Sequence, residues 1–449
     1  MFKKVLIANR GEIAVRIIRA CRELGVRTVA VFSEADRDAL HAKIADEAIC
    51  IGPASTAESY LNIKAILAAC ELTGADALHP GFGFLSENAN FARMCARCGV
   101  TFIGPSPEAM LLMGDKATAK QTMRDADVPV VPGSDGLIGS VEEAAEIAAR
   151  VGYPVMIKAS AGGGGRGIRR VDRPEELEDA ITTAKREAQS FFGDDGVYLE
   201  KFIVDPRHVE VQLLADHYGN VVHLGERDCS LQRRNQKMVE ECPCPVLSPE
   251  MRKKMGDAAV RAAIACGYEN AGTVEFLLSG NDFYFMEMNT RIQVEHPVTE
   301  FVTGIDIVKM QLRIAAGELL PFSQEDIHMQ GHAIECRINA ENPAQGFRPS
   351  PGKITSLYMP GGPGIRIDTA VYSGYEITPY YDSMIAKLIA YAPTREEALM
   401  KMKWALAEFL VEGVDTNIDF QLKLLRDPDV ETADYDIGFL GRNIGRLTR

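Results

Sequence analysis

The chain has 449 residues, which is too long for one ordinary hydrophobic core, so we expect two to four domains. Its 49 Lys and Arg residues against 63 Asp and Glu residues give a net charge of −14, which argues against nucleic-acid and anionic-membrane partners. No stretch approaches the roughly 20 apolar residues that span a bilayer, and ten cysteines in so long a chain favour reduced thiols in the cytoplasm.

The first segment alternates strands and helices. A strand at 5–9, a helical stripe of apolar residues at 11–24 and a β-branched strand at 28–32 predict the opening of a parallel α/β sheet. The alternation continues to a strand that ends at His79, and the loop PGFGF at 80–84 follows it, where α/β proteins usually bind ligands. The turn ANRGE after the first strand lacks G-x-G-x-x-G, so the dinucleotide fingerprint is absent.

A second segment begins near residue 114 and carries a run of glycines. After the strand at 155–158, five glycines occur within six positions: Gly162, Gly163, Gly164, Gly165 and Gly167. Consecutive glycines let backbone N–H groups approach phosphate oxygens closely, and Lys158 adds a positive charge directly before them. A flexible linker would be polar on both sides, whereas strand-like sequences flank this run. We therefore predict a phosphate-binding hairpin flap.

A hairpin of two strands, at 273–278 and 283–288, brings two glutamates together. With a loop at 280–282, Glu275 and Glu287 would be direct cross-strand neighbours. Like charges in that position are destabilising, and both strands look buried, so the pair needs a cation. Mg²⁺ with nucleotide phosphates suits carboxylate oxygens. The alternative is two solvated glutamates on an edge strand, which the apolar neighbours make the weaker interpretation.

The sequence EMNTRIQVE at 287–295 alternates polar and apolar residues. An extended chain would place one set on a single face: Glu287, Asn289, Arg291, Gln293 and Glu295. A half-exposed strand shows the same alternation, but these are not preferred strand residues. Five different functional groups in a row therefore favour a binding or catalytic site.

Six segments, in order along the chain, resemble the signature motifs of the biotin carboxylases, the ATP-dependent components of biotin-dependent carboxylases such as bacterial acetyl-CoA carboxylase. They are IANRGEIA at 7–14, HPGFGFLSEN at 79–88, KASAGGGGRG at 158–167, ERDCSLQRR at 226–234, EMNTRIQVEHPVTE at 287–300 and ECRINAE at 335–341. The resemblance covers essentially the whole chain.

The resemblance implies an ATP-grasp fold that combines α/β and α+β parts. The expected domains are an N-terminal parallel α/β domain at 1–113, an ATP-grasp domain at 114–330 and a strand-rich C-terminal domain at 331–449. Within the ATP-grasp domain, a mobile glycine-rich lid is expected at about 130–203.

By resemblance, ATP and a metal ion have assigned positions. The residues that match ATP contacts are Lys116, Lys158, Gly163, Gly164, Gly165, Glu200, Lys201, Ile203, His208, Gln232 and Leu277. Three of these, Glu200, Lys201 and Ile203, resemble the hinge that holds the adenine. The residues that match ligands of Mg²⁺ or Mn²⁺ are Glu275, Glu287 and Asn289.

By the same resemblance, bicarbonate is held by Lys237, Arg291, Gln293, Val294 and Glu295, and the catalytic residues are Glu295, Arg291, Lys237 and Arg337. Glu295 resembles the base that removes the proton of bicarbonate as it attacks the γ-phosphorus of ATP, giving carboxyphosphate and ADP. Arg337 resembles the residue beside the biotin ureido oxygen. The implied reaction is the carboxylation of biotin, the first half-reaction of acetyl-CoA carboxylase in fatty acid synthesis, with another acyl-CoA or pyruvate carboxylase as the alternative.

The implied partners are a separate biotin carboxyl carrier protein, carboxyltransferase subunits and a second copy of the chain. Arg19, Glu23 and Arg366 match the dimer interface of the family, whereas Pro363 stands where a well-known bacterial relative has an aromatic residue. Asn235 stands where some relatives have histidine, so we assign it no nucleotide contact.

Three other functions are compatible with parts of the sequence. The glutamate pair, the lysines and the glycines would equally fit another ATP-grasp ligase, but Arg291, Glu295 and Arg337 together favour bicarbonate and biotin. The first strand–helix–strand unit suggests a nicotinamide oxidoreductase, which the missing fingerprint disfavours. A non-catalytic relative ranks last, because no site position is lost.

The third segment, from His332, is predicted to be strand-rich and to end in one clear helix. That helix contains MKM around Lys401, which resembles the core of a biotin-attachment sequence. Thr394 and Glu397 form a T-x-x-E capping box, Glu397 and Lys401 are spaced for an i,i+4 pair, and Gly413 is the predicted stop. Apolar residues recur at helical spacing: Leu399, Met402, Leu406, Phe409 and Leu410. Lys401 is therefore predicted to lie mid-helix on a polar face and to carry no biotin.

Overall fold

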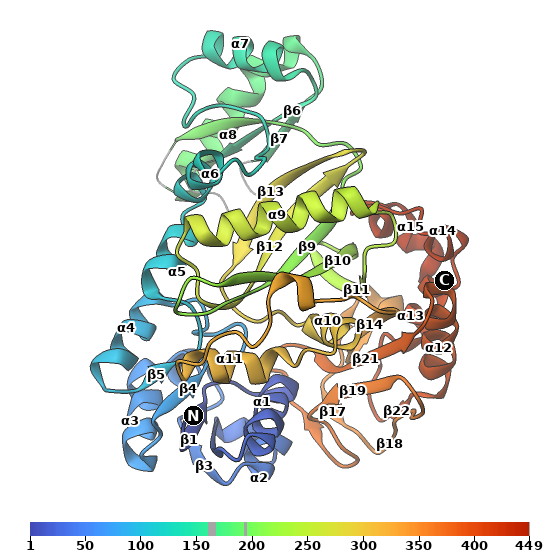
Figure 1. Cartoon of the computed structure of the whole chain (residues 1–449). Helices are drawn as coiled ribbons and strands as arrows, with labels where there is room; N and C mark the ends of the chain where they lie inside the picture. The colour runs from blue at the N-terminus through green and yellow to red at the C-terminus, as the bar shows by residue number, and fades with distance from the viewer. Residues whose placement is uncertain (160–167, 193–194, 449) are drawn as a thin grey trace.

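The computed structural model describes residues 1–159, 168–192 and 195–448 of the chain (Figure 1). The glycine run at 162–167, with Gly163, Gly164 and Gly165, lies outside the described residues. In the described ranges, no helix is long and apolar enough to span a membrane. All ten cysteines are free thiols.

The N-terminal segment forms a five-stranded parallel sheet, as its alternating sequence predicts, in the order β3-β2-β1-β4-β5. The strands are β1 Lys4–Ile7, β2 Arg27–Phe32, β3 Glu47–Cys50, β4 Ala77–His79 and β5 Thr101–Phe102. The helices are α1 Gly11–Glu23, α2 Leu40–Ile44, α3 Ile63–Thr73, α4 Ala89–Arg97 and α5 Pro107–Gly114. Val5, Leu6 and Ile7 are fully buried, as is usual for a central parallel strand covered on both faces.

A small antiparallel sheet stands at the top of Figure 1, above the rest of the chain. Its order is β7-β6-β8, with β6 Val155–Ala159, β7 Ile168–Val171 and β8 Val197–Lys201. The helices α6 Lys116–Asp125, α7 Val141–Val151 and α8 Leu177–Phe192 accompany it. The predicted hairpin around the glycine run is confirmed, because β6 and β7 pair in antiparallel fashion with Lys158 opposite Ile168.

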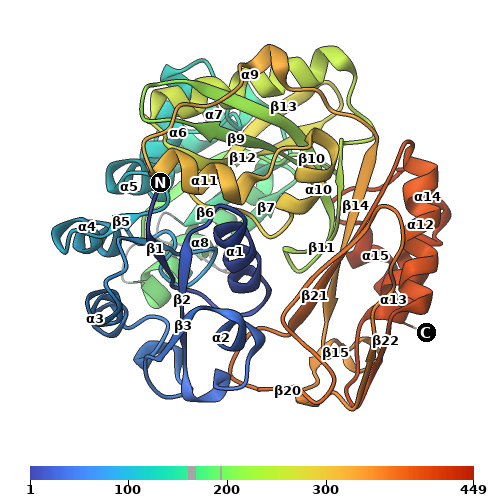
Figure 2. The same cartoon turned by 60° about the horizontal axis from the view of Figure 1, so that its bottom comes forward.

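The largest sheet has eight antiparallel strands in the order β13-β12-β9-β10-β11-β14-β21-β19, and Figure 2 shows β10, β11, β14 and β21 in succession. These strands are β9 Arg207–Ala215, β10 Val221–Arg233, β11 Gln236–Cys242, β12 Asn270–Ser279, β13 Asp282–Asn289, β14 His332–Asn339, β19 Ile365–Thr369 and β21 Met384–Ala392. The sheet runs across residue 330 without a break, because β11 pairs with β14.

The two faces of this sheet have different coverings. On β9, Val209, Val211 and Leu213 pack under helix α9, Pro249–Ala265, in one apolar cluster. The side chains that alternate with them point to the other face, where α10, His296–Thr303, and α11, Ile307–Ala315, lie. That second face holds the polar residues of the candidate site.

The C-terminal segment corrects the prediction of one final helix. The structure has α12 Arg395–Glu408, α13 Ile418–Leu425, α14 Pro428–Glu431 and α15 Phe439–Leu447. The short strands before and between them are β15 Glu341–Asn342, β16 Arg348–Pro349, β17 Gly352–Lys353, β18 Ser356–Tyr358, β20 Glu376–Ile377 and β22 Leu410–Glu412. Hydrophobic periodicity predicted too few helices here, because most of them are short and directly follow turns.

Helix α12 also ends earlier than its sequence predicts. Thr394 caps it by accepting a hydrogen bond from the Glu397 N–H, which is one half of the predicted capping box. The helix stops at Glu408 rather than at Gly413, because Leu410 is drawn into β22 and pairs with Tyr358 of β18. No Glu397–Lys401 ion pair forms between these two described residues.

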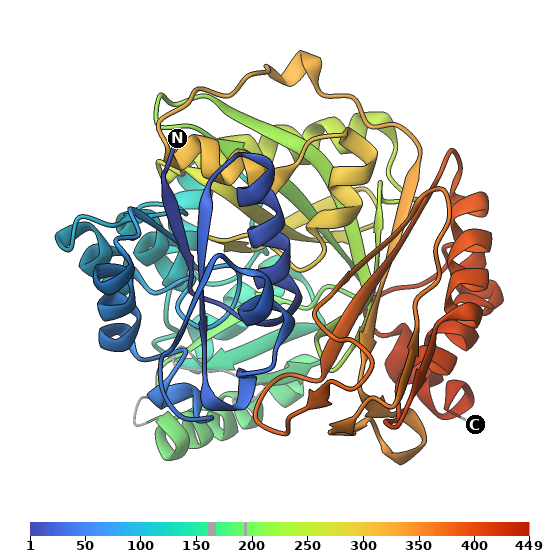
Figure 3. The same cartoon turned by 90° about the horizontal axis from the view of Figure 1, so that it is seen from below.

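A buried ion pair in the N-terminal segment lies against the C-terminal segment, and Figure 3 shows these two parts of the chain side by side. Arg10 donates to both oxygens of Asp36, at 2.6 Å and 2.8 Å, and Tyr60 donates to the same carboxylate at 2.6 Å. The guanidinium of Arg10 lies 4.2 Å from the ring centre of Tyr381, which comes from the C-terminal domain. Burial alone would raise the pKa of Asp36, but its hydrogen bonds with Arg10 lower it below the usual range.

We predict that Asp36→Asn lowers the stability at pH 7 by about 3–5 kcal/mol, because it leaves the Arg10 charge buried without its partner. Urea unfolding of the full chain measures the change. Since the folded-state pKa of Asp36 is depressed, its contribution is present above the unfolded pKa of about 3.9 and is lost as the pH falls through the folded value. The gap between variant and wild type should therefore close in acid.

Asp257→Asn is the matched control, because Asp257 forms an exposed i,i+4 pair with Lys253 and should cost only about 0.3–0.5 kcal/mol. Equal losses in the two variants would contradict a larger contribution of the buried pair to stability.

Candidate active site

The hairpin of β12 and β13 brings Glu275 and Glu287 directly opposite each other, as the sequence predicted. The predicted loop is wrong, however. Ser279 pairs with Asp282, so the turn has two residues, and a β-bulge between Phe276 and Glu275 restores the predicted register. Burial also differs from the expectation: Glu275 is buried, but Glu287 is exposed at the rim.

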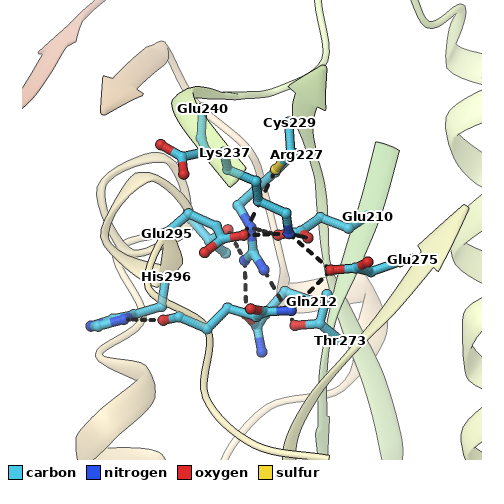
Figure 4. Close-up of polar contacts among 12 residues, drawn as sticks. Glu210, Gln212, Arg227, Cys229, Lys237, Glu240, Thr273, Glu275, Glu295 and His296 are labelled. Atoms are coloured by element: carbon cyan, nitrogen blue, oxygen red, sulfur yellow. Dashed lines mark hydrogen bonds and ion pairs between the residues drawn. The ribbon is translucent and has the colours of Figure 1, made fainter. Parts of the chain in front are cut away.

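Lys237 on β11 is the centre of the site (Figure 4). Its ammonium lies 2.6 Å from Glu210, 2.8 Å from Glu275 and 2.6 Å from Glu295, and all three carboxylates are buried. Arg227, which is fully buried on β10, donates to Glu210 at 2.5 Å. Two cations thus neutralise most of a buried cluster of three acids.

Glu295 receives a second cation from the neighbouring strand β14. Arg337 donates to Glu295 at 3.1 Å and to Glu240 at 2.5 Å, so its guanidinium links the two carboxylates. Burial by itself would raise the pKa of Glu295, but the charges of Lys237, Arg337 and Arg227 lower it well below the usual range. For Glu240, burial is the largest effect and raises the pKa to about 7 despite Arg337.

The segment 290–295 is not extended, which corrects the single-strand interpretation. The strand β13 ends at Asn289, and the chain then turns into α10 with Glu295 as the residue before the first helical turn. The turn still gathers the predicted side chains, because Arg291 donates to Asn289 at 2.9 Å and to Gln293 at 3.0 Å. Gln293 in turn donates to Glu275 at 3.2 Å.

The residues assigned to the nucleotide lie in two groups. On the small sheet, Lys158 lies 2.5 Å from Glu200, and Lys120 on α6 is ion-paired with the same carboxylate. Burial and, to a smaller extent, the nearby charge of Lys116 together lower the pKa of Lys158 to about 8. The side chain of Lys201 on β8 donates to the carbonyls of Gly152 at 2.8 Å and of residue 153 at 3.0 Å.

The second group lies on the eight-stranded sheet. His208 is opposite Leu277 in the pairing of β9 with β12, and its Nε2 lies 3.1 Å from Glu275. Gln232 is opposite Lys237. Ile203 is half-buried. In the sequence it lies between β8 of the small sheet and β9 of the eight-stranded sheet. His208 therefore connects the residues assigned to the nucleotide with the acidic cluster.

Several residues of the site were not predicted. Glu210 could have been found from the polar residues that alternate along β9, namely His208, Glu210 and Gln212. Glu87 could not, because it comes from the loop after β4 and lies some 200 residues away in sequence from its partners. It accepts from Arg291 at 2.9 Å and from the Thr290 N–H at 3.1 Å. No sequence pattern indicated Glu240 or Lys120 as residues of the site.

The donor atoms present fit a hard divalent cation. His208, Glu210 and Glu275 have ligand atoms within 4.8 Å of one another, but Lys237 already neutralises this group. Glu287 has no ion-pair partner among the described residues, and partial burial together with the charge of Glu275 raises its pKa. Glu287 is therefore the acid of the site that lacks a cation among the described residues, and its oxygens, next to those of Glu275, suit Mg²⁺ or Mn²⁺.

Comparison with known families covers nearly the whole chain. The family described as "Biotin carboxylase, N-terminal domain" matches residues 1–110, "Carbamoyl-phosphate synthase L chain, ATP binding domain" matches 115–323, and "Biotin carboxylase C-terminal domain" matches 335–442.

Individual relatives agree with these matches. Biotin carboxylase 1 of Bacillus subtilis is 59% identical over 442 residues, 98% of each chain. A pyruvate carboxylase subunit of Methanothermobacter thermautotrophicus is 55% identical over 98% of this chain and 90% of its own. The crystal structure of the biotin carboxylase domain dimer of Hydrogenobacter thermophilus 2-oxoglutarate carboxylase, in complex with MgADP, ADP and bicarbonate, has a TM-score of 0.91 at 53% identity and covers 100% of this chain and 99% of that one. With its parallel N-terminal sheet, its small three-stranded sheet and its eight-stranded sheet, the chain belongs to the biotin carboxylase family of ATP-dependent ligases and has their ATP-grasp fold.

Proposed function

We propose that the chain carboxylates biotin with ATP and bicarbonate through carboxyphosphate, releasing ADP and phosphate, and that the residues around Lys237 carry out the first step. The observation that supports this most strongly is the contact of Glu295 with two cations, Lys237 at 2.6 Å and Arg337 at 3.1 Å. These charges hold the carboxylate in its ionised form, which is the form that a proton acceptor requires.

In the first step, Lys237, Arg291, Gln293 and Val294 hold bicarbonate beside Glu295. Glu295 takes the proton of bicarbonate while a bicarbonate oxygen attacks the γ-phosphorus of ATP. The bond from that phosphorus to the ADP oxygen breaks, and ADP leaves. Glu87 keeps Arg291 in place by accepting from its Nε, which leaves the two terminal nitrogens of the guanidinium for polar groups in the site.

ATP lies between the small sheet and the eight-stranded sheet in this proposal. Lys116 and Lys158 neutralise phosphate charge, the glycine run with Gly163, Gly164 and Gly165 covers the phosphates, and residues at 200–203 hold the adenine. The remaining contacts come from His208, Gln232 and Leu277. Glu275, Glu287 and Asn289 would hold Mg²⁺ or Mn²⁺, which when bound neutralises charge on the transferring phosphoryl group.

In the second step, carboxyphosphate gives CO₂ and phosphate, and the phosphate takes the N1′ proton of biotin. Arg337 stabilises the negative charge that develops on the ureido oxygen, and the biotin nitrogen attacks CO₂. Arg337 has a fifth of its side chain exposed, whereas its partner Glu295 is fully buried, so only the arginine is open to an incoming ring.

We propose that biotin arrives on a separate carrier protein in the cytoplasm and that a carboxyltransferase passes the carboxyl group to acetyl-CoA. Pyruvate is the second candidate acceptor, because a pyruvate carboxylase subunit is nearly as similar as the biotin carboxylases. Identification of the transferase that co-purifies with the chain separates the two. The proposed domain divisions are 1–113, 114–330 with the lid at about 130–203, and 331–449, close to the limits of the family matches.

The proposed active form is a homodimer. A cleft between α1, α10 and β19 is lined by charged side chains that include Arg19, Glu23 and Arg366. Exposed apolar side chains also occur on the neighbouring C-terminal strands, where Tyr358 pairs with Leu410. The relative crystallised with MgADP is likewise described as a dimer.

Glu295→Gln should lower bicarbonate-dependent ATP cleavage by about 10²–10⁴-fold, because the variant keeps the shape of the side chain but removes the base. Calorimetry with MgADP should show nearly unchanged nucleotide binding. Turnover near that of the wild type, with intact dependence on bicarbonate, would contradict the role of Glu295. Glu226→Gln is the matched control, since Glu226 is also buried and ion-paired, 2.8 Å from Arg252, but lies outside the site.

Arg337→Ala should separate the two half-reactions. ATP cleavage requires no charge on the biotin oxygen, so it should decline less than biotin carboxylation, although the contact with Glu295 is also lost. Both rates are to be measured on one preparation with free biotin. Equal losses would mean that Arg337 acts in the bicarbonate step instead.

Lys401 should remain unmodified when the chain is produced with an active biotin ligase. Its ammonium donates to the carbonyls of Pro363 at 2.8 Å and Tyr391 at 2.7 Å, and it lies within α12 rather than in an exposed turn. Intact mass spectrometry followed by peptide mapping is the test. The mass of one biotin on Lys401 would refute the proposal of a separate carrier.

A further inference from the structure

The turn that carries Glu295 is held from outside the acidic cluster. Glu295 precedes the first turn of α10, yet its side chain makes no capping hydrogen bond with that helix. The carboxylate instead accepts hydrogen bonds from Lys237 and Arg337, with the Cys229 thiol 3.9 Å away. Other groups must therefore fix the backbone of the turn, and two buried side chains do so.

His296 fixes the first peptide of the turn. Its Nδ1 lies 2.8 Å from the carbonyl oxygen of Gln293, and since that oxygen can only accept, Nδ1 carries the proton. Burial lowers the pKa of His296 well below its usual range, and the charge of Lys387 lowers it further, so the ring is neutral. In a trans peptide the N–H points opposite to the carbonyl, so this contact also sets the direction of the Val294 N–H.

Lys387 fixes the next peptide. This residue is fully buried on β21, and its ammonium donates to the carbonyl oxygen of Val294 at 2.9 Å. Two carboxylates keep it charged: Glu12 of α1 at 3.2 Å and Asp368 of β19 at 3.7 Å. Asp368 is in turn bound by Arg366 through both oxygens, at 2.9 Å and 2.7 Å. A single lysine thus joins the N-terminal helix, the C-terminal strands and the turn before α10.

We propose that Lys387 is a positioning residue for the bicarbonate step: by holding the Val294 carbonyl, it keeps the backbone at Glu295 in the orientation that directs the carboxylate to Lys237. The proposal rests on the proposed function and extends it to a residue that touches neither substrate. A purely structural role is the alternative, in which Lys387 serves only to neutralise Glu12 and Asp368.

The two roles separate in a double variant. Lys387→Met removes the ammonium and leaves Glu12 without its partner, so it lowers stability under either role. Lys387→Met combined with Glu12→Gln removes one charge of each sign and restores the balance, but it still lacks the donor to Val294. The double variant therefore keeps the test valid even if the single variant folds poorly.

The assay uses the full chain with MgATP, varied bicarbonate and free biotin, with MgADP binding and urea unfolding measured on the same preparations. Lys387→Met and the double variant should lose about 10- to 100-fold in kcat/KM for bicarbonate, the usual consequence of small misplacement of a reacting group. Nucleotide affinity should stay within about 3-fold of the wild type, because the lid residues are untouched. The double variant should regain stability but not activity.

Lys4→Met is the matched control. Like Lys387, Lys4 donates to a backbone carbonyl, that of Thr73 at 2.5 Å, and pairs with a carboxylate, Glu47 at 2.8 Å. It is partly buried and lies in the N-terminal sheet, away from the site. It should lose stability without a change in bicarbonate kinetics. Recovery of wild-type kcat/KM in the double variant would overturn the positioning role. If the wild-type chain shows no bicarbonate-dependent ATP cleavage, the proposed function and the inference are both overturned. If the wild type is active and the Lys387 variants match it, only the inference is overturned.

Discussion

The site depends on the neutralisation of buried acids by Lys237. Glu210, Glu275 and Glu295 converge on one ammonium, and removal of that cation would leave three buried carboxylates to Arg227, Arg337 and His208. Breaking one buried pair typically costs about 3–5 kcal/mol, so the cluster is stable only as a complete set. The fold must therefore place side chains from several strands around Lys237, with little tolerance for their displacement.

The pairing register of the eight-stranded sheet places these side chains. Directly paired residues form a charged row from Glu287 through Glu275 and Glu210 to Arg227, and a second row from Arg337 through Lys387 to Asp368. Cross-strand neighbours lie about 5 Å apart, so Arg227 reaches Glu210 directly, whereas the like charges of Glu287, Glu275 and Glu210 need a cation from another strand, which Lys237 supplies to Glu275 and Glu210. Because β11 and β14 join the rows, the ATP-grasp part and the C-terminal part cannot separate without breaking the site.

The sequence predicted what local pattern and long motifs encode. The parallel opening sheet, the flap strands and the Glu275–Glu287 pair follow from periodicity and turn chemistry, and the fold followed from the resemblance. The loop length, the bulge and the end of β13 at Asn289 did not follow, because tertiary pairing decides them. Glu87 and Lys387 were missed for the same reason: their partners, Arg291 and the Val294 carbonyl, lie about 200 and 90 residues away in sequence.

The depressed pKa of Glu295 raises a question about its role, because a strongly stabilised carboxylate is a weak base. The arrangement of carboxylates around Lys237 explains how Glu295 can still act as a base. Lys237 is shared among three carboxylates, so an anionic substrate that enters beside it competes for the same ammonium and adds a negative charge next to Glu295. Both effects raise the pKa of Glu295. In the proposed function, Glu295 is therefore a weak proton acceptor while the site is empty and gains basicity when bicarbonate binds. The backbone at Val294 must hold still while this exchange of partners takes place.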